Sequence, residues 1–198
     1  MQKPALFLLC AAIGVKSSAF GGLIIPSSYT ATPGEVGGYT YYDDTGRQLT
    51  DGVFGVNDWS ADLGNGPAYE WVGWFSVNPT FTFDFASSVT VDKVLIDFSR
   101  SETPGGPTLY GNIHLPTDVN INGTSYSLAG NEIPDYTRGT IEFAGSWTGS
   151  TLTVTLSHRW WLFVDEVQFN EVPEPGAYGL VAALGLINFG ALRRARCE

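Results

Sequence analysis

The chain has 198 residues, which fits one domain or at most two small ones. Acidic residues outnumber basic ones by 20 to 10, and this excludes a nucleic-acid partner, because phosphate binding needs clustered Lys and Arg side chains. With 43% hydrophobic and 14% aromatic residues the chain is not disordered as a whole, and its 24 glycines and 11 prolines are typical of short strands joined by turns.

Residues 1–19 predict a secretory signal peptide. Lys3 supplies a small positive region, residues 5–15 form an apolar run, and residues 17–19 are the small residues that a signal peptidase requires before the cut. The alternative, a buried first helix, is less favoured because the apolar run has no polar face. We therefore expect an N-terminal signal helix, export across the inner membrane and removal of this segment by signal peptidase.

Residues 20–171 predict one all-β domain. Short runs that alternate polar with β-branched or aromatic residues recur between turn signals, and no long segment has helical periodicity. We expect strands in residues 22–25, 79–85, 89–98, 117–121, 125–128, 140–144, 151–156 and 161–169. Asn122-Gly123, between two of these runs, is the strongest hairpin signal. The number and spacing of the strands favour a sandwich of two antiparallel sheets.

Residues 172–198 predict a separate C-terminal segment with three parts. Residues 172–176 (VPEPG) are extended and incompatible with a helix because of their prolines. The next 16 residues, 177–192, are uncharged, and as a short transmembrane helix they would span about 24 Å, less than the hydrocarbon core of about 30 Å. Arg193 and Arg194 follow, and the positive-inside rule would keep them in the cytoplasm.

This tail resembles the PEP-CTERM sorting signal that exosortases recognise in Gram-negative bacteria. The resemblance rests on the order of Pro173-Glu174-Pro175, the short apolar run, and the basic cluster that begins with Arg193 and Arg194. It implies an exosortase as a partner, processing near the prolines, transient contact with the inner membrane, and release to the cell surface or beyond, in association with exopolysaccharide or biofilm matrix. An ordinary membrane anchor or an amphipathic core helix is the alternative.

The two cysteines of the chain, Cys10 and Cys197, both lie in segments that we expect to be removed. The mature domain would then hold no disulfide, although it is exported to an oxidising compartment. Its stability must come from its core, with a bound metal as a further source.

Several segments of the central domain follow one another in the order typical of galactose-binding-like (discoidin-type) domains. They are residues 28–30 (SYT), 42–46 (YDDTG), 48–53 (QLTDGV), 70–74 (EWVGW), 81–85, 89–96, 116–123 (PTDVNING) and 163–169 (FVDEVQF). The central domain therefore resembles this family. The resemblance implies an antiparallel jelly-roll β-sandwich and, by analogy, a place among carbohydrate-binding modules, lectins and adhesion domains.

The same resemblance implies a structural calcium ion, which many of these domains hold. The matching positions are Asp51, in an early loop, and Glu166, in the last strand, and Asp44 is close enough in sequence to add an oxygen. Calcium takes six to eight oxygen ligands, backbone carbonyls included, and Gly52 would let the loop bend around it. The alternative for residues 43–46 is a simple Asx turn. The alternative for Asp51 and Glu166 is that both carboxylates are solvated and bind no metal.

A sugar site needs aromatic faces for pyranose rings and a few polar groups for hydroxyls. The candidates are aromatic residues in loops, together with two polar residues that flank the long loop of residues 99–112, a candidate binding edge: Trp59, Tyr69, Tyr110, Arg100 and His114. Trp71 and Trp74 are instead expected to pack inside the sandwich. Residues 158–161 (HRWW) either bind an anion or are only the entry to the last strand.

The net charge of the central domain restricts the class of glycan that we expect it to bind. Residues 20–171 hold 18 acidic and five basic residues, a net charge near −13. Such a domain repels anionic polymers at low salt, so we expect neutral glycans, or acidic glycans bridged by calcium.

Catalysis is not expected. His114 and His158 have no metalloprotease spacing, and no nucleophile motif is present. A pair of carboxylates for glycoside hydrolysis is the least favoured reading. The sequence thus predicts a non-catalytic, exported domain that binds carbohydrate. The alternative is a purely structural or adhesive protein of the envelope or biofilm that has no sugar site.

Overall fold

The computed structural model describes residues 22–35, 41–60, 70–102 and 112–172. In these ranges every regular element is a β-strand, which confirms the all-β prediction. The strands are β1 (Gly22–Ile24), β2 (Ser28–Ala31), β3 (Val72–Phe75), β4 (Thr80–Arg100), β5 (Asp118–Ile121), β6 (Thr124–Ser127), β7 (Thr137–Ser157) and β8 (Trp161–Glu171).

The strands form one hydrogen-bonded sheet, where the sequence predicted two. Its order is β1-β8-β4-β7-β5-β6, with β2 paired to β4 and β3 paired to β8, and each of these pairs is antiparallel. The difference lies in β4 and β7, each 21 residues long, which were predicted as two strands apiece. Residues 86–88 are exposed but contain no Gly or Pro, so the backbone stays extended there and β4 continues with a register shift instead of ending.

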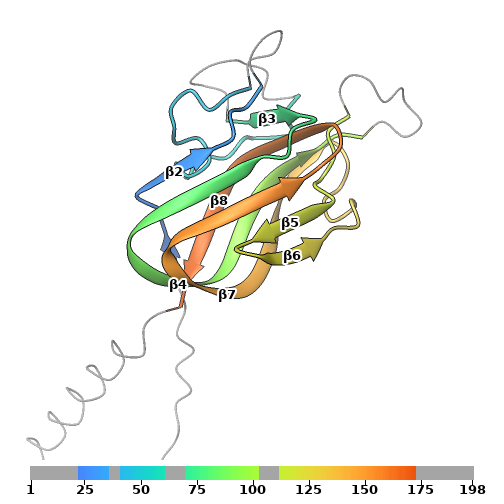
Figure 1. Cartoon of the computed structure of the whole chain (residues 1–198). Coiled ribbons are helices and arrows are strands. Elements are labelled where there is room, and N and C mark those ends of the chain that lie inside the picture. The colour runs from blue at the N-terminus through green and yellow to red at the C-terminus, as the bar shows by residue number, and fades with distance from the viewer. Residues whose placement is uncertain (1–21, 36–40, 61–69, 103–111, 173–198) are drawn as a thin grey trace, which may run out of the picture.

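The two long strands bend, and the bend folds the single sheet over on itself (Figure 1). The first half of β4 pairs with β2 and the second half pairs with β8. Phe83, from the first half, nevertheless has its ring centroid 4.8 Å from that of Phe169 in β8. The two halves of the sheet therefore face each other across a shared core, as the layers of a sandwich do.

Alternating apolar residues of the long strands fill the main core. Phe81 and Phe83 on one half, and Val94, Ile96 and Phe98 on the other, are all fully buried. This is the period-two pattern of a strand with one face inward.

A second, aromatic cluster lies between β3 and β8. It contains Trp71, Ile113, Trp161 and Phe163, with Tyr41 and Trp59 packed against it. Trp71 and Trp74 are buried, as predicted. Gly73 lies so close to Phe163 that an added Cβ would sit 2.6 Å from its ring, so β3 can only pair with β8 here because residue 73 has no side chain.

The predicted hairpin at Asn122-Gly123 is confirmed. Ile121 of β5 pairs with Thr124 of β6, and the two residues between them have φ angles of 46° and 88°. Positive φ at both positions is the type I′ geometry that Asn-Gly favours.

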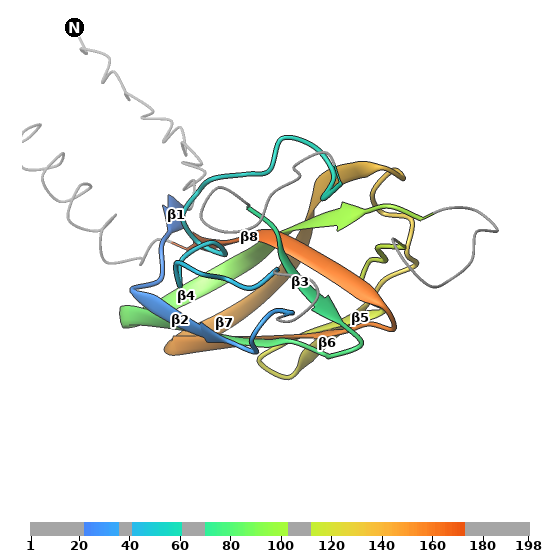
Figure 2. The same cartoon turned by 90° about the horizontal axis from the view of Figure 1, so that it is seen from above.

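β8 runs between two ends of the domain. Near its last residue, Gly22 pairs with Glu171, so the two ends of the described domain lie side by side. At its first residue, Phe75 of β3 pairs with Trp161. Figure 2 shows β1 and β3 beside different stretches of β8.

The two predicted terminal helices lie outside the described residues, as do Cys10, Cys197 and the proposed processing residues Pro173, Glu174, Pro175, Arg193 and Arg194. Across the ranges that the structure does describe, there is no helix of a length and apolar character suited to crossing a membrane.

Candidate functional site

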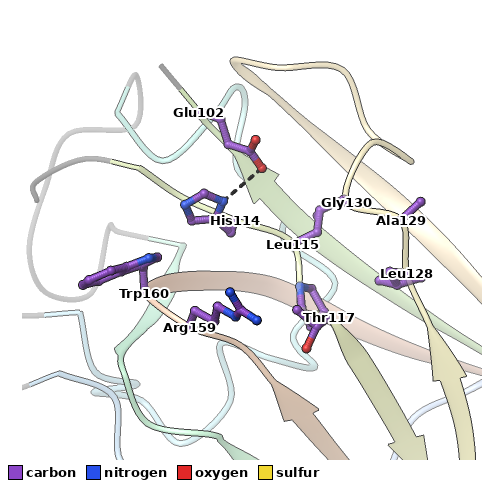
Figure 3. A pocket seen from close by; sticks show the side chains of 10 residues that line it. Glu102, His114, Leu115, Thr117, Leu128, Ala129, Gly130, Arg159 and Trp160 are labelled. Carbon is purple, nitrogen blue, oxygen red and sulfur yellow. Dashed lines mark ion pairs between the residues drawn. The ribbon is translucent and has the colours of Figure 1, made fainter. Parts of the chain in front are cut away.

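A pocket of about 370 Å³ lies next to the start of β8 (Figure 3). Its described lining comes from the strand ends and connections around residues 102, 114–117, 128–130 and 159–160. The side chains with chemical function in this lining are Glu102, His114, Thr117, Arg159 and Trp160.

Glu102 organises one wall of the pocket. Its Oε1 lies 3.2 Å from Nδ1 of His114, and its two oxygens each accept a hydrogen bond of 3.2 Å from the guanidinium of Arg100. Arg100 also donates to the carbonyl of Ile133 at 2.8 Å. Arg100 therefore lies behind the wall, where it neutralises and orients the carboxylate that holds His114.

Arg159 and Trp160 form the opposite wall. The residues that follow β3 hydrogen-bond to the backbone of this segment. Ser76 donates its backbone N–H to the carbonyl of Trp160 at 2.8 Å and its hydroxyl to the carbonyl of Arg159 at 3.3 Å. Ser76 has a φ of 52°, a conformation that a non-glycine residue rarely adopts. Phe75 lies against Trp160, with 6.4 Å between ring centroids.

His158 makes two further hydrogen bonds that connect this segment to the residues after β3. Its backbone N–H donates to Oδ1 of Asn78 at 3.0 Å, and its ring Nε2 is bonded to the carbonyl of Val77. Burial lowers the pKa of His158, so the ring is neutral near pH 7. Four hydrogen bonds thus join residues 158–160 to residues 76–78, and they hold the backbone that carries Arg159 and Trp160 in place.

The structure separates the predicted sugar-binding residues. His114 lines the pocket and Arg100 supports it from behind. Trp59 instead stacks on Phe163 in the second core cluster, with centroids 5.3 Å apart and ring planes 19° from parallel. Tyr69 and Tyr110 lie outside the described residues.

Sequence reasoning did not include Glu102 in the site and left Arg159 and Trp160 undecided. The HRWW run was the available signal, since it combines a cation with aromatic residues just before a strand. Glu102 lies within residues 99–112, the loop that the sequence offered as a binding edge, but its pairing with His114 depends on the fold.

A second pocket, of about 240 Å³, contains two of the predicted calcium ligands, Asp51 and Glu166. Both oxygens of Glu166 lie 3.2 Å from the backbone N–H of Gly52, which has a φ of 78°. Burial, with a contribution from the nearby charge of Asp51, raises the pKa of Glu166 to about 7. The fold therefore brings the early loop and the last strand together, as the family resemblance implied.

Asp44 lies apart from that pocket. Its side chain is exposed and its backbone N–H donates to Gln48. The neighbouring Asp43 uses Oδ1 to accept the backbone N–H of Gly46 at 2.7 Å and accepts the hydroxyl of Tyr29 on Oδ2. Residues 43–46 thus form the Asx turn that the sequence offered as the alternative.

The residues at Asp51 and Glu166 fit a calcium ion in one respect. Among the described residues, no Lys, Arg or His pairs with the buried carboxylate of Glu166, so a cation there would compensate its charge. In the same part of the chain, no group of three or more His, Cys, Asp or Glu residues is arranged around a metal position. Any remaining ligands would have to be backbone carbonyls or water.

A buried ionic network fixes the loop that carries Asp51. Asp165 accepts the backbone N–H of Gly55 at 2.6 Å, and Asp97, also buried, lies 3.4 Å from Nε of Arg138. Arg138 in turn donates to the carbonyl of Gly55. Burial raises the pKa of Asp165 to about 8, with the charge of Asp97 contributing. The network holds the loop on β8 and β7.

No family model matches the chain, and no curated protein matches it. Among solved structures it is similar to a fucolectin from striped bass (Morone saxatilis) serum, with 18% identity, a TM-score of 0.43, and coverage of 73% of this chain and 46% of that one. A fucose-binding module from Streptococcus pneumoniae is 14% identical, with a TM-score of 0.43 over 77% of this chain and 96% of the module. A family 32 carbohydrate-binding module from C. perfringens, in complex with galactose, is 13% identical, with a TM-score of 0.36 over 72% of this chain and 91% of the module. The match thus spans less than half of the fucolectin and most of each bacterial module.

Proposed function

We propose that the domain binds carbohydrate without transforming it, in the pocket formed by Glu102, His114, Arg159 and Trp160. The observation that carries the proposal is the combination, in one pocket, of an aromatic ring, a guanidinium, and a Glu–His pair whose nearest oxygen and nitrogen atoms are 3.2 Å apart. A sugar ring has an apolar face and a polar edge, and this combination offers a partner to each.

Each side chain has a distinct role in this proposal. Trp160 packs against the apolar face of a pyranose. His114 and Glu102 exchange hydrogen bonds with hydroxyls, and Arg159 donates to an oxygen on the opposite side. Arg100 and Ser76 touch no sugar; they are positioning residues that reduce the conformational entropy lost on binding.

Binding without catalysis is preferred because of the state of Glu102. It is the one carboxylate among the described lining residues, and it already pairs with Arg100 and His114. Glycoside hydrolysis usually needs two carboxyl groups on either side of the scissile bond. A structural or adhesive role without a sugar site remains the competing proposal.

The test is a titration of the purified protein with a glycan panel, followed by alanine substitution in the pocket. We expect Trp160→Ala and His114→Ala to weaken binding at least tenfold. Tyr42→Ala, which removes an aromatic residue that is 42% exposed and does not line this pocket, should leave binding unchanged. A protein that binds no glycan on the panel would support the structural role instead.

We further propose that a calcium ion held by Asp51 and Glu166 stabilises the domain, and that the chain is exported and sorted. The export proposal rests on the sequence of residues 1–19 and 172–198. Mass spectrometry of the released protein tests it: the mature chain should begin at Phe20 and end near Pro173–Pro175, and a chain that keeps both terminal segments contradicts it.

A further inference from the structure

An exposed aromatic ring lies directly beside the sugar pocket without being part of its described lining. Phe75, the last residue of β3, has its ring centroid 6.4 Å from that of Trp160, and the two ring planes are tilted by 39°. Phe75 is 37% exposed, so the surrounding protein covers only part of it. Two residues further along the chain, Val77 is 46% exposed. The apolar surface that begins at Trp160 therefore continues outside the pocket over Phe75.

The backbone that carries this surface is held in an unusual conformation. Ser76 lies between Phe75 and Val77, and its φ of 52° is rare for a residue other than glycine. Two hydrogen bonds maintain it, from the N–H of Ser76 to the carbonyl of Trp160 at 2.8 Å and from its hydroxyl to the carbonyl of Arg159 at 3.3 Å. Residues in such conformations are enriched at ligand sites. The rings of Phe75 and Trp160 thus belong to one rigid unit of backbone.

Core packing explains only part of the position of Phe75. Its ring centroid lies 5.1 Å from that of Trp161, which belongs to the second core cluster. This contact accounts for the covered part of Phe75. The exposed part gains nothing from it, because an apolar surface is stabilised only where it is removed from water. That part of the ring is available to a ligand that extends beyond the pocket.

The spacing of the two rings suits successive sugars of a glycan. A pyranose packs its apolar face on an aromatic ring, and two linked pyranoses are joined through a single oxygen. In Figure 3 Trp160 lies at one end of the pocket, with Leu128 and Ala129 at the other. A glycan that leaves the pocket at the Trp160 end would meet Phe75 next. Rotation about the glycosidic bond would let each sugar follow the tilt of its own ring.

We propose that Phe75 is a second stacking surface, so that the site recognises two consecutive sugars of a glycan chain and not one isolated sugar. The inference rests on the proposed sugar site and adds a specificity-determining residue to it. Phe75 offers no polar group to hydroxyls, so it selects for chain length more than for the identity of the second sugar. The first sugar is identified in the pocket, by Glu102, His114 and Arg159.

The experiment measures how affinity depends on glycan length. Glucose, galactose and mannose, the β-1,4-linked dimer of each, and the monomer and dimer from the panel glycan that binds best are titrated into the purified protein. In the series that binds, the dimer should bind about fivefold more tightly than the monomer, or better. Phe75→Leu keeps an apolar contact with Trp161 but removes the flat ring. It should lower the affinity of the dimer to that of the monomer, whereas Phe75→Tyr should retain the difference.

Tyr42→Ala is the matched control, since it removes an aromatic residue that is 42% exposed and does not line the pocket. It should leave both affinities unchanged. Equal affinity of monomer and dimer in the wild-type protein, or an equal loss for both in Phe75→Leu, would overturn the second stacking surface and leave the sugar site intact. Failure of every monomer, dimer and panel glycan to bind would instead remove the proposed function itself.

Discussion

At the scale of single residues, the proposed function would depend on groups that do not line the pocket. Arg100 neutralises Glu102, and Ser76 and His158 hold the backbone under Arg159 and Trp160. His158 is the most sensitive of these, because its ring is buried and bonded through Nε2 to the carbonyl of Val77.

Stability should therefore depend on pH through His158. Its pKa is lowered in the folded protein from the usual value of 6.5, so the unfolded chain binds a proton more readily. The stability that the neutral ring contributes is present above pH 6.5 and is lost as the pH falls below that value. Burial raises the pKa values of Asp97, Asp165 and Glu166, which gives these groups the opposite trend.

A comparison with His158→Gln isolates the contribution of the histidine. The free energy of unfolding of each protein is measured by urea denaturation between pH 7.5 and pH 5. The advantage of the wild-type protein over the variant should shrink as the pH falls. A constant or growing advantage would show that His158 is not held neutral.

At the scale of elements, the sequence predicted most strands and the β5–β6 hairpin, because alternation and Asn-Gly turns are local signals. It missed β2 and β3, each four residues long, which exist because β4 and β8 offer them partners. It also divided β4 and β7, since local pattern does not show whether an exposed stretch turns or continues.

The same limit applies to the site. His114 and the meeting of Asp51 with Glu166 followed from the family resemblance and from loop position. The pairing of Glu102 with His114, and the packing of Trp59 against Phe163, depend on contacts between segments that are apart in the sequence. Trp59 shows this well: a tryptophan in a loop with polar neighbours was expected to be available to a sugar, but it packs against Phe163.

Gly73→Ala tests the close packing of β3 on β8. The new methyl group would lie 2.6 Å from the Phe163 ring, so the ring or the strand must move, at a cost of about 1–3 kcal/mol in unfolding free energy. The control is Gly22→Ala in β1, where nothing lies within 4 Å of the added carbon. Equal stability of the two variants in urea denaturation would show that this contact is not tight.

At the scale of the whole molecule, the two ends of β8 lie beside different features of the domain. The chain ends of the described domain meet at the Gly22–Glu171 pair, and the sugar pocket adjoins the opposite end, before Trp161. Ten residues of extended strand separate them by about 33 Å. The proposed sugar pocket is therefore far from the point at which the described domain ends.

Calcium should stabilise this whole domain if Asp51 and Glu166 hold it. A ligand at 100 times its dissociation constant adds about 2.7 kcal/mol, which raises the melting temperature by roughly 5–10 °C for a domain of this size. Glu166→Gln should abolish the response, whereas Asp44→Asn should retain it. A melting temperature that a chelator does not change in the wild-type protein would exclude the ion.

The central claim, a sugar site at Trp160, is tested most directly by the indole N–H signals of the six tryptophans in an NMR titration with a bound glycan. The signal of Trp160 should shift most, with a smaller effect on the adjacent Trp161. The signals of the tryptophans outside the pocket, Trp59, Trp71, Trp74 and Trp147, should stay in place. A dominant shift of Trp59 with Trp160 unmoved would place the sugar elsewhere and contradict the proposed site.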